Sequence, residues 1–161
     1  MEKKRLIKGV LFIMAVVLFL LSPVLSFAAG TVTPTLKYRD DGVAQLTFTC
    51  VADAADGTFP ATASNVTNAT FVFDGYAVLG VTLPGSTAPT ANYDITITDS
   101  DGVDVFGGAL EDRSATVKEQ AFPQDSNGLG GGRFCFGALT LTITNNSVNS
   151  ADIVIIITID Q

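Results

Sequence analysis

Three aspartates in the stretch NYDITITDSDGVDVFGG are the residues best placed to do chemistry. Asp99, Asp101 and Asp104 stand close together in the chain, and carboxylates clustered at loop spacing suit a hard cation such as calcium. The spacing of an EF-hand loop is not met, because Gly102 comes too early and no bidentate Glu follows. A catalytic carboxylate pair would need a nucleophile or an orienting base, and the stretch supplies neither.

The same stretch also has the pattern of a β-hairpin. Tyr93, Ile95 and Ile97 alternate with polar residues before the acidic turn, and Val103 and Val105 resume the apolar face after it. Asp and Ser early in a turn and Gly at its end are the residues that turn geometry favours. We therefore expect a structural hairpin turn here, with a calcium site as the alternative.

Other catalytic and cofactor motifs are missing from the sequence. The chain contains no His, which excludes Ser-His-Asp and Cys-His catalysis and most zinc sites. The run GLGGGR lacks the Gly-Lys-Ser/Thr ending of a phosphate-binding loop, so we interpret it as a flexible loop. The sequence predicts no enzyme activity and no cofactor.

The first 28 residues have the pattern of a secretory signal peptide. Four basic residues precede an uncharged apolar run, Pro23 follows it, and small residues stand at the end. We expect cleavage between Ala28 and Ala29, export to the periplasm or the extracellular space, and no membrane association afterwards. An uncleaved anchor is the alternative, because the uncharged stretch 9–29 is long enough to span a bilayer.

The remaining residues, 29–161, have the length of one domain and a strongly acidic charge. They carry five Lys and Arg against 15 Asp and Glu, a net charge near −10. Proteins that bind nucleic acid neutralise phosphates with clustered Lys and Arg. Nucleic acid is therefore excluded as a partner.

Two cysteines in an exported chain predict a disulfide. Cys50 shares its alternation phase with Leu46 and Phe48, and Cys135 shares its phase with Leu139 and other apolar residues. Both thiols should then point into the same core. Phase shows facing and not distance, so two buried thiols that are not bonded are the alternative.

Alternation of apolar and polar residues with period two predicts an all-β fold. The expected strands are residues 31–38, 43–52, 70–73, 75–83, 93–98, 103–106, 133–144 and 152–159. Short strands at this spacing indicate a single-domain antiparallel β-sandwich of the jelly-roll kind. We expect residues 111–132, which are rich in Gly, to form an irregular surface excursion.

Two features of these strands bear on binding. Residues 153–157 are all apolar, so we expect this strand to be covered on both faces, by the chain itself or by another subunit. The phenylalanines on strands, Phe134 and Phe136 among them, are interpreted as core residues, with an aromatic binding platform as the alternative. A homo-oligomer or another protein is the expected partner.

Three runs carry a resemblance to a known group of proteins. They are DGTFPAT, the run from GYAVLGVTLPGSTAPTANYDI through DSDGVDVFGGALEDRS, and GALTLTITNNSVNSADIVIIITI. Together they resemble small β-rich structural proteins encoded by tailed bacteriophages and prophages, described as virion-associated or of unknown function. The resemblance implies no catalytic or binding residues. It favours a non-enzymatic structural or interaction protein acting through protein contacts or self-assembly, with an extracellular carbohydrate- or surface-binding module as the alternative.

Overall fold

The computed structural model describes residues 28–39, 42–66, 69–70 and 73–161. Within these ranges the chain forms strands and turns without a helix, and every strand pair is antiparallel. The predicted all-β fold is therefore confirmed. The predicted signal segment lies outside the described residues, apart from Ala28 at the predicted cleavage point.

The larger sheet has six strands. It runs in the order β1 (Thr31–Tyr38), β2 (Val43–Val51), β11 (Asp152–Asp160), β6 (Phe73–Pro84) and β8 (Glu119–Ala121). The sixth strand, β9 (Arg133–Gly137), pairs with the first part of β6, whereas β8 pairs with a later part. The C-terminal strand β11 thus lies in the middle of the sheet.

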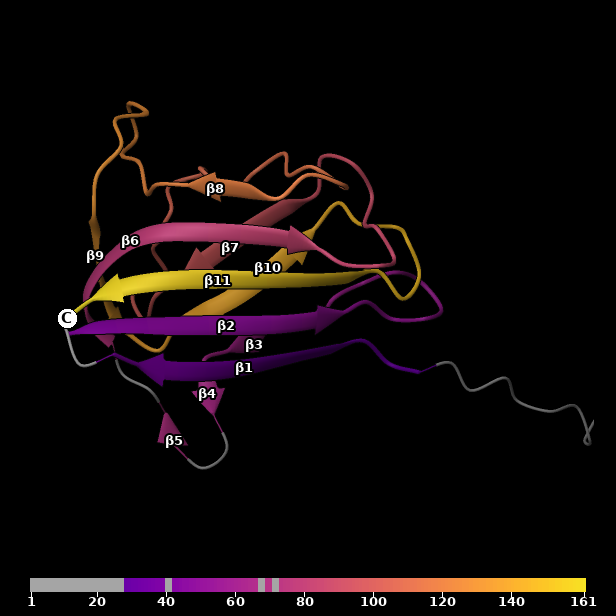
Figure 1. Cartoon of the computed structure of the whole chain (residues 1–161), viewed down its shortest axis with the longest axis horizontal. Helices are drawn as coiled ribbons and strands as arrows, with labels where there is room; N and C mark the ends of the chain where they lie inside the picture. The colour runs from indigo at the N-terminus through magenta and orange to yellow at the C-terminus, as the bar shows by residue number, and fades with distance from the viewer. Residues whose placement is uncertain (1–27, 40–41, 67–68, 71–72) are drawn as a thin grey trace, which may run out of the picture.

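A second layer packs on one face of this sheet (Figure 1). It is the three-stranded sheet β3 (Thr62–Ala63), β10 (Thr140–Thr144) and β7 (Asp94–Thr98). A small hairpin of β4 (Asn65–Val66) and β5 (Ala69–Thr70) extends beside β1. Two antiparallel layers packed face to face are consistent with a β-sandwich.

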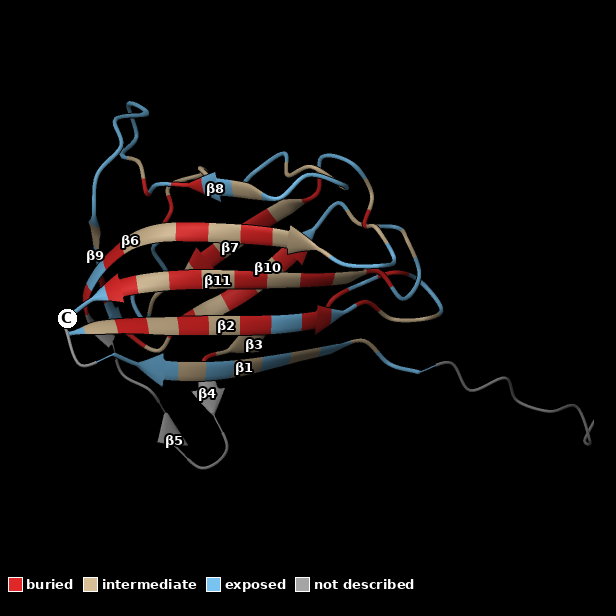
Figure 2. Ribbon diagram, viewed as in Figure 1, coloured by how far each residue is buried: buried red, intermediate tan, exposed pale blue. Residues whose placement is uncertain are grey.

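The core fills the space between the two layers, and the strands alternate between core and solvent (Figure 2). On β11, Ile153, Ile155, Ile157 and Ile159 are buried. Val154 and Ile156 point the other way and stay partly exposed. The expectation that this strand is covered on both faces is therefore not met by the described part of the chain.

Several predicted strand boundaries were wrong. Residues 133–144 form two strands, because the chain leaves the larger sheet at Gly137, which has a φ of 76° and lies against Ser100, and enters the smaller sheet as β10. The predicted strand 103–106 is only a single bridge between Thr98 and Asp104. Strand β8 lies inside the region predicted to be irregular. Part of the predicted strand 70–73 lies outside the described residues.

Candidate functional site

The acidic turn reverses the chain after β7, as predicted, although the strand expected on its far side is a single bridge. The carboxylate of Asp99 accepts hydrogen bonds from the backbone N–H groups of Asp101, at 3.1 Å, and Val103, at 3.0 Å. The carboxylate of Asp104 accepts from Phe106 N, at 3.1 Å, and Gly108 N, at 2.7 Å. Two of the three carboxylates thus hold their own backbone, which is the usual role of Asp in turns.

This arrangement gives the calcium alternative no geometric support. Asp99 and Asp104 direct carboxylate oxygens at N–H donors, which orients them for turn formation and not around a common centre. In the part of the chain that the structure describes, no three His, Cys, Asp or Glu side chains form a group suited to a metal ion.

The two cysteines are not bonded to each other, which corrects the predicted disulfide. Both are buried in the core, so the predicted facing is confirmed. Cys50 pairs with Ile153 at one end of β11, whereas Cys135 pairs with Gly75, next to the partner of Asp160 at the other end. Seven residues of strand separate these ends, roughly 23 Å, and a disulfide requires Cα atoms less than about 7 Å apart.

Burial also makes the Cys50 thiol unreactive. It raises the pKa of Cys50 to about 12, so the thiolate that acts as a nucleophile or metal ligand does not form at neutral pH. The Cys135 thiol donates a hydrogen bond to the carbonyl of Gly75 at 3.3 Å. The cysteines therefore serve as core residues.

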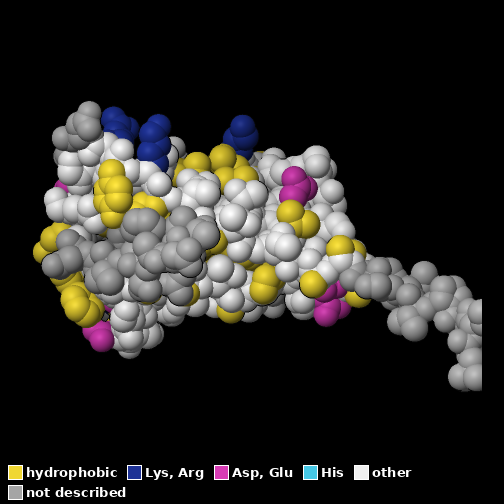
Figure 3. Space-filling model, turned by 90° about the horizontal axis from the view of Figure 1, so that it is seen from below, with side chains coloured by type: hydrophobic (Ala, Val, Ile, Leu, Met, Phe, Trp, Pro, Cys, Tyr) yellow, Lys and Arg dark blue, Asp and Glu magenta, His cyan; other side chains and the backbone are white. Residues whose placement is uncertain are grey.

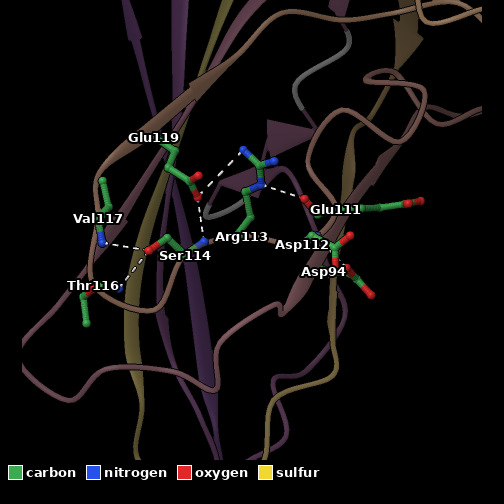
Figure 4. Close-up of polar contacts among 8 residues, drawn as sticks. All are labelled: Asp94, Glu111, Asp112, Arg113, Ser114, Thr116, Val117 and Glu119. Carbon is green, nitrogen blue, oxygen red and sulfur yellow. Dashed lines mark hydrogen bonds and ion pairs between the residues drawn. The ribbon is translucent and has the colours of Figure 1, made fainter.

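A polar network orders the loop between β7 and β8 (Figure 4). The carboxylate of Glu119 accepts a hydrogen bond from Ser114 N at 2.6 Å and lies 3.9 Å from the guanidinium of Arg113. The hydroxyl of Ser114 in turn accepts from the N–H groups of Thr116 and Val117. This network ties the loop to strand β8, which explains how a Gly-rich, irregular segment contains a strand.

Aspartate 94 holds the other end of the same loop and a second loop beside it. Its carboxylate accepts a hydrogen bond from Asp112 N at 2.8 Å and another from the side-chain amide of Asn145. Asp112 and Asn145 both have left-handed backbone conformations, with φ of 53° and 60°. Because non-glycine residues adopt this conformation at an energetic cost, Asp94 stabilises two strained turns at once.

Two hydroxyl groups are buried next to this network, on Thr82, which pairs with Glu119, and on Tyr93, which pairs with Arg113. Tyr93 Oη and Thr82 Oγ1 are enclosed in the core, and neither forms a hydrogen bond of good geometry within the described residues. Burial raises the pKa of Tyr93 to about 12, although the neighbouring Thr82 hydroxyl partly offsets this effect. The phenol is therefore neutral at physiological pH and cannot act as a base there.

The motif residues behind the phage-protein resemblance mainly hold loops. The carboxylate of Asp152 accepts hydrogen bonds from the N–H groups of Ser86 and Thr87. A Cβ atom on Gly85 would lie 1.8 Å from that carboxylate, so the Pro-Gly-Ser-Thr turn requires glycine at this position. Asn146 accepts from Thr90 N at 2.8 Å and so fixes the other end of the turn.

The glycine-rich stretch closes a hairpin loop. Asp125 accepts hydrogen bonds from the N–H groups of Asn127, at 2.8 Å, and Leu129, at 3.0 Å, and these bonds lower the pKa of its carboxyl group. Arg133 donates to the carbonyl of Gln124 across the loop. A shallow concave surface of about 430 Å³ lies beside these residues, and its polar side chains, Gln124, Asp125 and Arg133, form hydrogen bonds with the backbone of the surrounding loops.

Exposed aromatic side chains were missed by the sequence interpretation. Tyr76, Phe134 and Phe136 are 52%, 48% and 50% exposed on β6 and β9, so the assignment of Phe134 and Phe136 to the core was wrong. The rings of Tyr76 and Phe134 meet edge to face with centroids 5.4 Å apart. The signal was present in the sequence, because the alternation that turns Cys135 inward turns both of its neighbours outward.

The aromatic residues adjoin a larger apolar surface. We call the face of the six-stranded sheet that points away from β7 and β10 the outer face. In its centre, five aliphatic side chains of neighbouring strands β11 and β6 form an apolar band, and all are partly exposed. The band consists of Val154 and Ile156 on β11 and Leu79, Val81 and Leu83 on β6.

The rest of the outer face is polar and nearly free of acidic groups. Beside the band, β1 and β2 present Thr33, Thr35, Thr47 and Thr49 in cross-strand pairs. Figure 3 shows Lys and Arg side chains along the upper edge of the view, which is the outer face seen from its side, next to apolar side chains. No described strand lies over this face in Figure 1.

Comparisons with protein-family models, curated proteins and solved structures find no match. In the described ranges, no helix has the length and apolar character needed to cross a membrane. The candidate functional site is therefore defined by its geometry, and that geometry identifies the outer face with its apolar band and aromatic corner.

Proposed function

We propose that this chain is an exported, non-enzymatic structural or interaction protein that works through protein contacts made by the outer face. The observation that carries the proposal is the apolar band. A sheet with one face in solvent normally alternates apolar residues inside with polar residues outside, whereas here five aliphatic side chains occupy outward positions. Contiguous, partly exposed apolar surface on an uncovered face marks interaction sites.

The chemistry of the remaining surface supports the same proposal. The carboxylates of Asp99, Asp104, Asp125 and Asp152 hold backbone turns, and the buried Cys50 thiol has a raised pKa. These groups are therefore occupied by structural roles. The resemblance to phage structural proteins agrees with a function in assembly, and the predicted signal peptide supports a function outside the cytoplasm.

The proposal is tested by photo-crosslinking in the producing cells. A photoreactive amino acid at Val154 on the outer face should yield a crosslinked protein adduct. The same amino acid at Thr142, which lies on the outward side of the smaller sheet, is the matched control and should yield less. If position 154 gives no protein adduct, or no more than position 142, the proposed function is wrong.

The exposed aromatic residues favour a second candidate function, a carbohydrate-binding module. Sugar rings stack on exposed aromatic faces, and Tyr76, Phe134 and Phe136 present three rings on one side of the sheet. Binding on a glycan array that is lost in Phe134→Ala and Tyr76→Ala, but retained in Ile156→Thr, would support it. If no glycan binds the unmodified protein, this candidate is excluded.

A further inference from the structure

We propose that the occupant of the outer face is a second copy of this chain, packed sheet against sheet around a twofold axis. The inference rests on the proposed function, because it names the partner for the same surface. Three features of the outer face support it: its area, the distribution of its charges, and the way its apolar half matches itself.

The area of the outer face is that of a stable dimer interface. Five strand positions spaced about 4.8 Å apart and nine residues at about 3.3 Å each give roughly 24 Å by 30 Å, or about 700 Å². A standard interface buries roughly 800 Å² on each partner. The outer face therefore suffices for a symmetric pair without help from other surfaces.

The charges of the chain favour this face over others for self-association. Residues 29–161 have a net charge near −10, so most approaches of two copies bring carboxylates together. On the outer face, Asp152 and Asp160 lie at the two ends of β11. Between these ends, Lys37 is the charged residue among the described paired positions of β1, β2, β11 and β6, and Asp74 on β6 lies beyond the row of Asp160. Repulsion between two copies is consequently weak on this face.

The apolar band also specifies the direction of the twofold axis. An axis parallel to the strands through β11, the middle strand of the sheet, would place β2 over β6 of the partner, so that threonines face the β6 part of the apolar band. An axis across the strands places apolar band over apolar band, which is the self-complementary arrangement that an isologous dimer requires. Aligned sheets cross at about 30°, so the acidic ends of β11 move apart.

This geometry places the middle of the band on the axis. Ile156 and Val81 are paired in the middle row of the outer face, so in the dimer each lies beside its own copy. Leu83 lies one outward row to one side of the axis, and Leu79 lies one outward row to the other side. Leu83 of one copy therefore lies over Leu79 of the second copy. Facing sheets lie about 10 Å apart, a gap that a short bis-maleimide bridges between cysteines.

The experiment uses the full chain as the producing cells release it. Ile156→Cys treated with a short bis-maleimide should give a covalent dimer at tens of micromolar, roughly the range expected for a standard interface. The parent protein is one control, because Cys50 and Cys135 are buried. Thr142→Cys is the other, since it places an accessible thiol on the opposite side of the sandwich. Both controls should remain uncrosslinked.

Light scattering provides the second measurement. The parent protein should have the mass of two chains, and the Ile156→Thr variant should have the mass of one. The melting temperatures of the two proteins, measured at a dilution where both are monomeric, should be the same. The fold should be unaffected by this substitution, because the neighbouring outward positions already hold threonine, at Thr47 and Thr158. A parent protein that stays monomeric up to about 100 µM, or equal crosslinking at positions 142 and 156, would overturn the dimer. If the photo-crosslinking at Val154 then captures a different protein, the second copy is refuted while the proposed function stands.

Discussion

The neighbouring residues Ile155 and Ile156 test which side of β11 is the core. Ile155 is fully buried between Phe48 and Thr82, whereas Ile156 lies partly exposed in the apolar band. Ile155→Ala removes three buried carbons, worth about 0.8 kcal/mol each, and leaves a cavity, so the free energy of unfolding should fall by about 3 to 4 kcal/mol. Ile156→Ala leaves no enclosed cavity and should lower it by about 1 kcal/mol or less.

The assay is urea unfolding of both variants at a concentration of about 1 µM, at which the interface proposed above is largely dissociated. The slope of the unfolding free energy against urea should stay the same in both variants, so that the shift in midpoint reports stability alone. Equal losses in the two variants would refute the assignment of faces. A larger loss for Ile156→Ala would show that the outward face is the real core.

Three further predictions concern the cysteines, one glycine and the acidic turn. Cys50 and Cys135 should resist a thiol reagent in the native protein and both react after unfolding without a reductant; a mass lower by two hydrogens would reveal a disulfide instead. Gly85→Ala should destabilise the protein by more than about 1 kcal/mol, since the added carbon overlaps a carboxylate, whereas Gly131→Ala, which meets nothing within 4 Å, should be near neutral in the same denaturation experiment. Millimolar calcium should leave the melting temperature unchanged in both the parent and Asp101→Asn, and a rise that occurs in the parent alone would establish a calcium site.

The fold class and most of the sheet could be predicted because alternation is a local property. Strand β1 coincides with its predicted range, and β2, β7 and β11 differ from theirs by a single residue at one end. Loop closure could not be predicted. Strand β8 is held in place by the carboxylate of Glu119, which accepts a hydrogen bond from Ser114 N. Such contacts between a side chain and a distant backbone group leave no periodic pattern in the sequence.

The wrong predictions of a disulfide and of buried phenylalanines have a common physical cause. Alternation gives the direction of a side chain and not its position along a sheet, so Cys50 and Cys135 could be assigned to one core but not to opposite ends of it. Applied consistently, the same rule would have placed Phe134 and Phe136 outside. The apolar band on β11 and β6 could be recognised only from the structure, which shows the face of the larger sheet that the second layer covers.

The most direct test of the central claim is the maleimide labelling rate of Ile156→Cys, measured in the producing cells' released material and again in purified, dilute protein. If a protein covers the outer face in its working state, the thiol should react more slowly before dilution than after it. Thr142→Cys should react at the same rate in both conditions. Equal rates for Ile156→Cys in the two conditions would contradict the claim that the outer face is a contact surface.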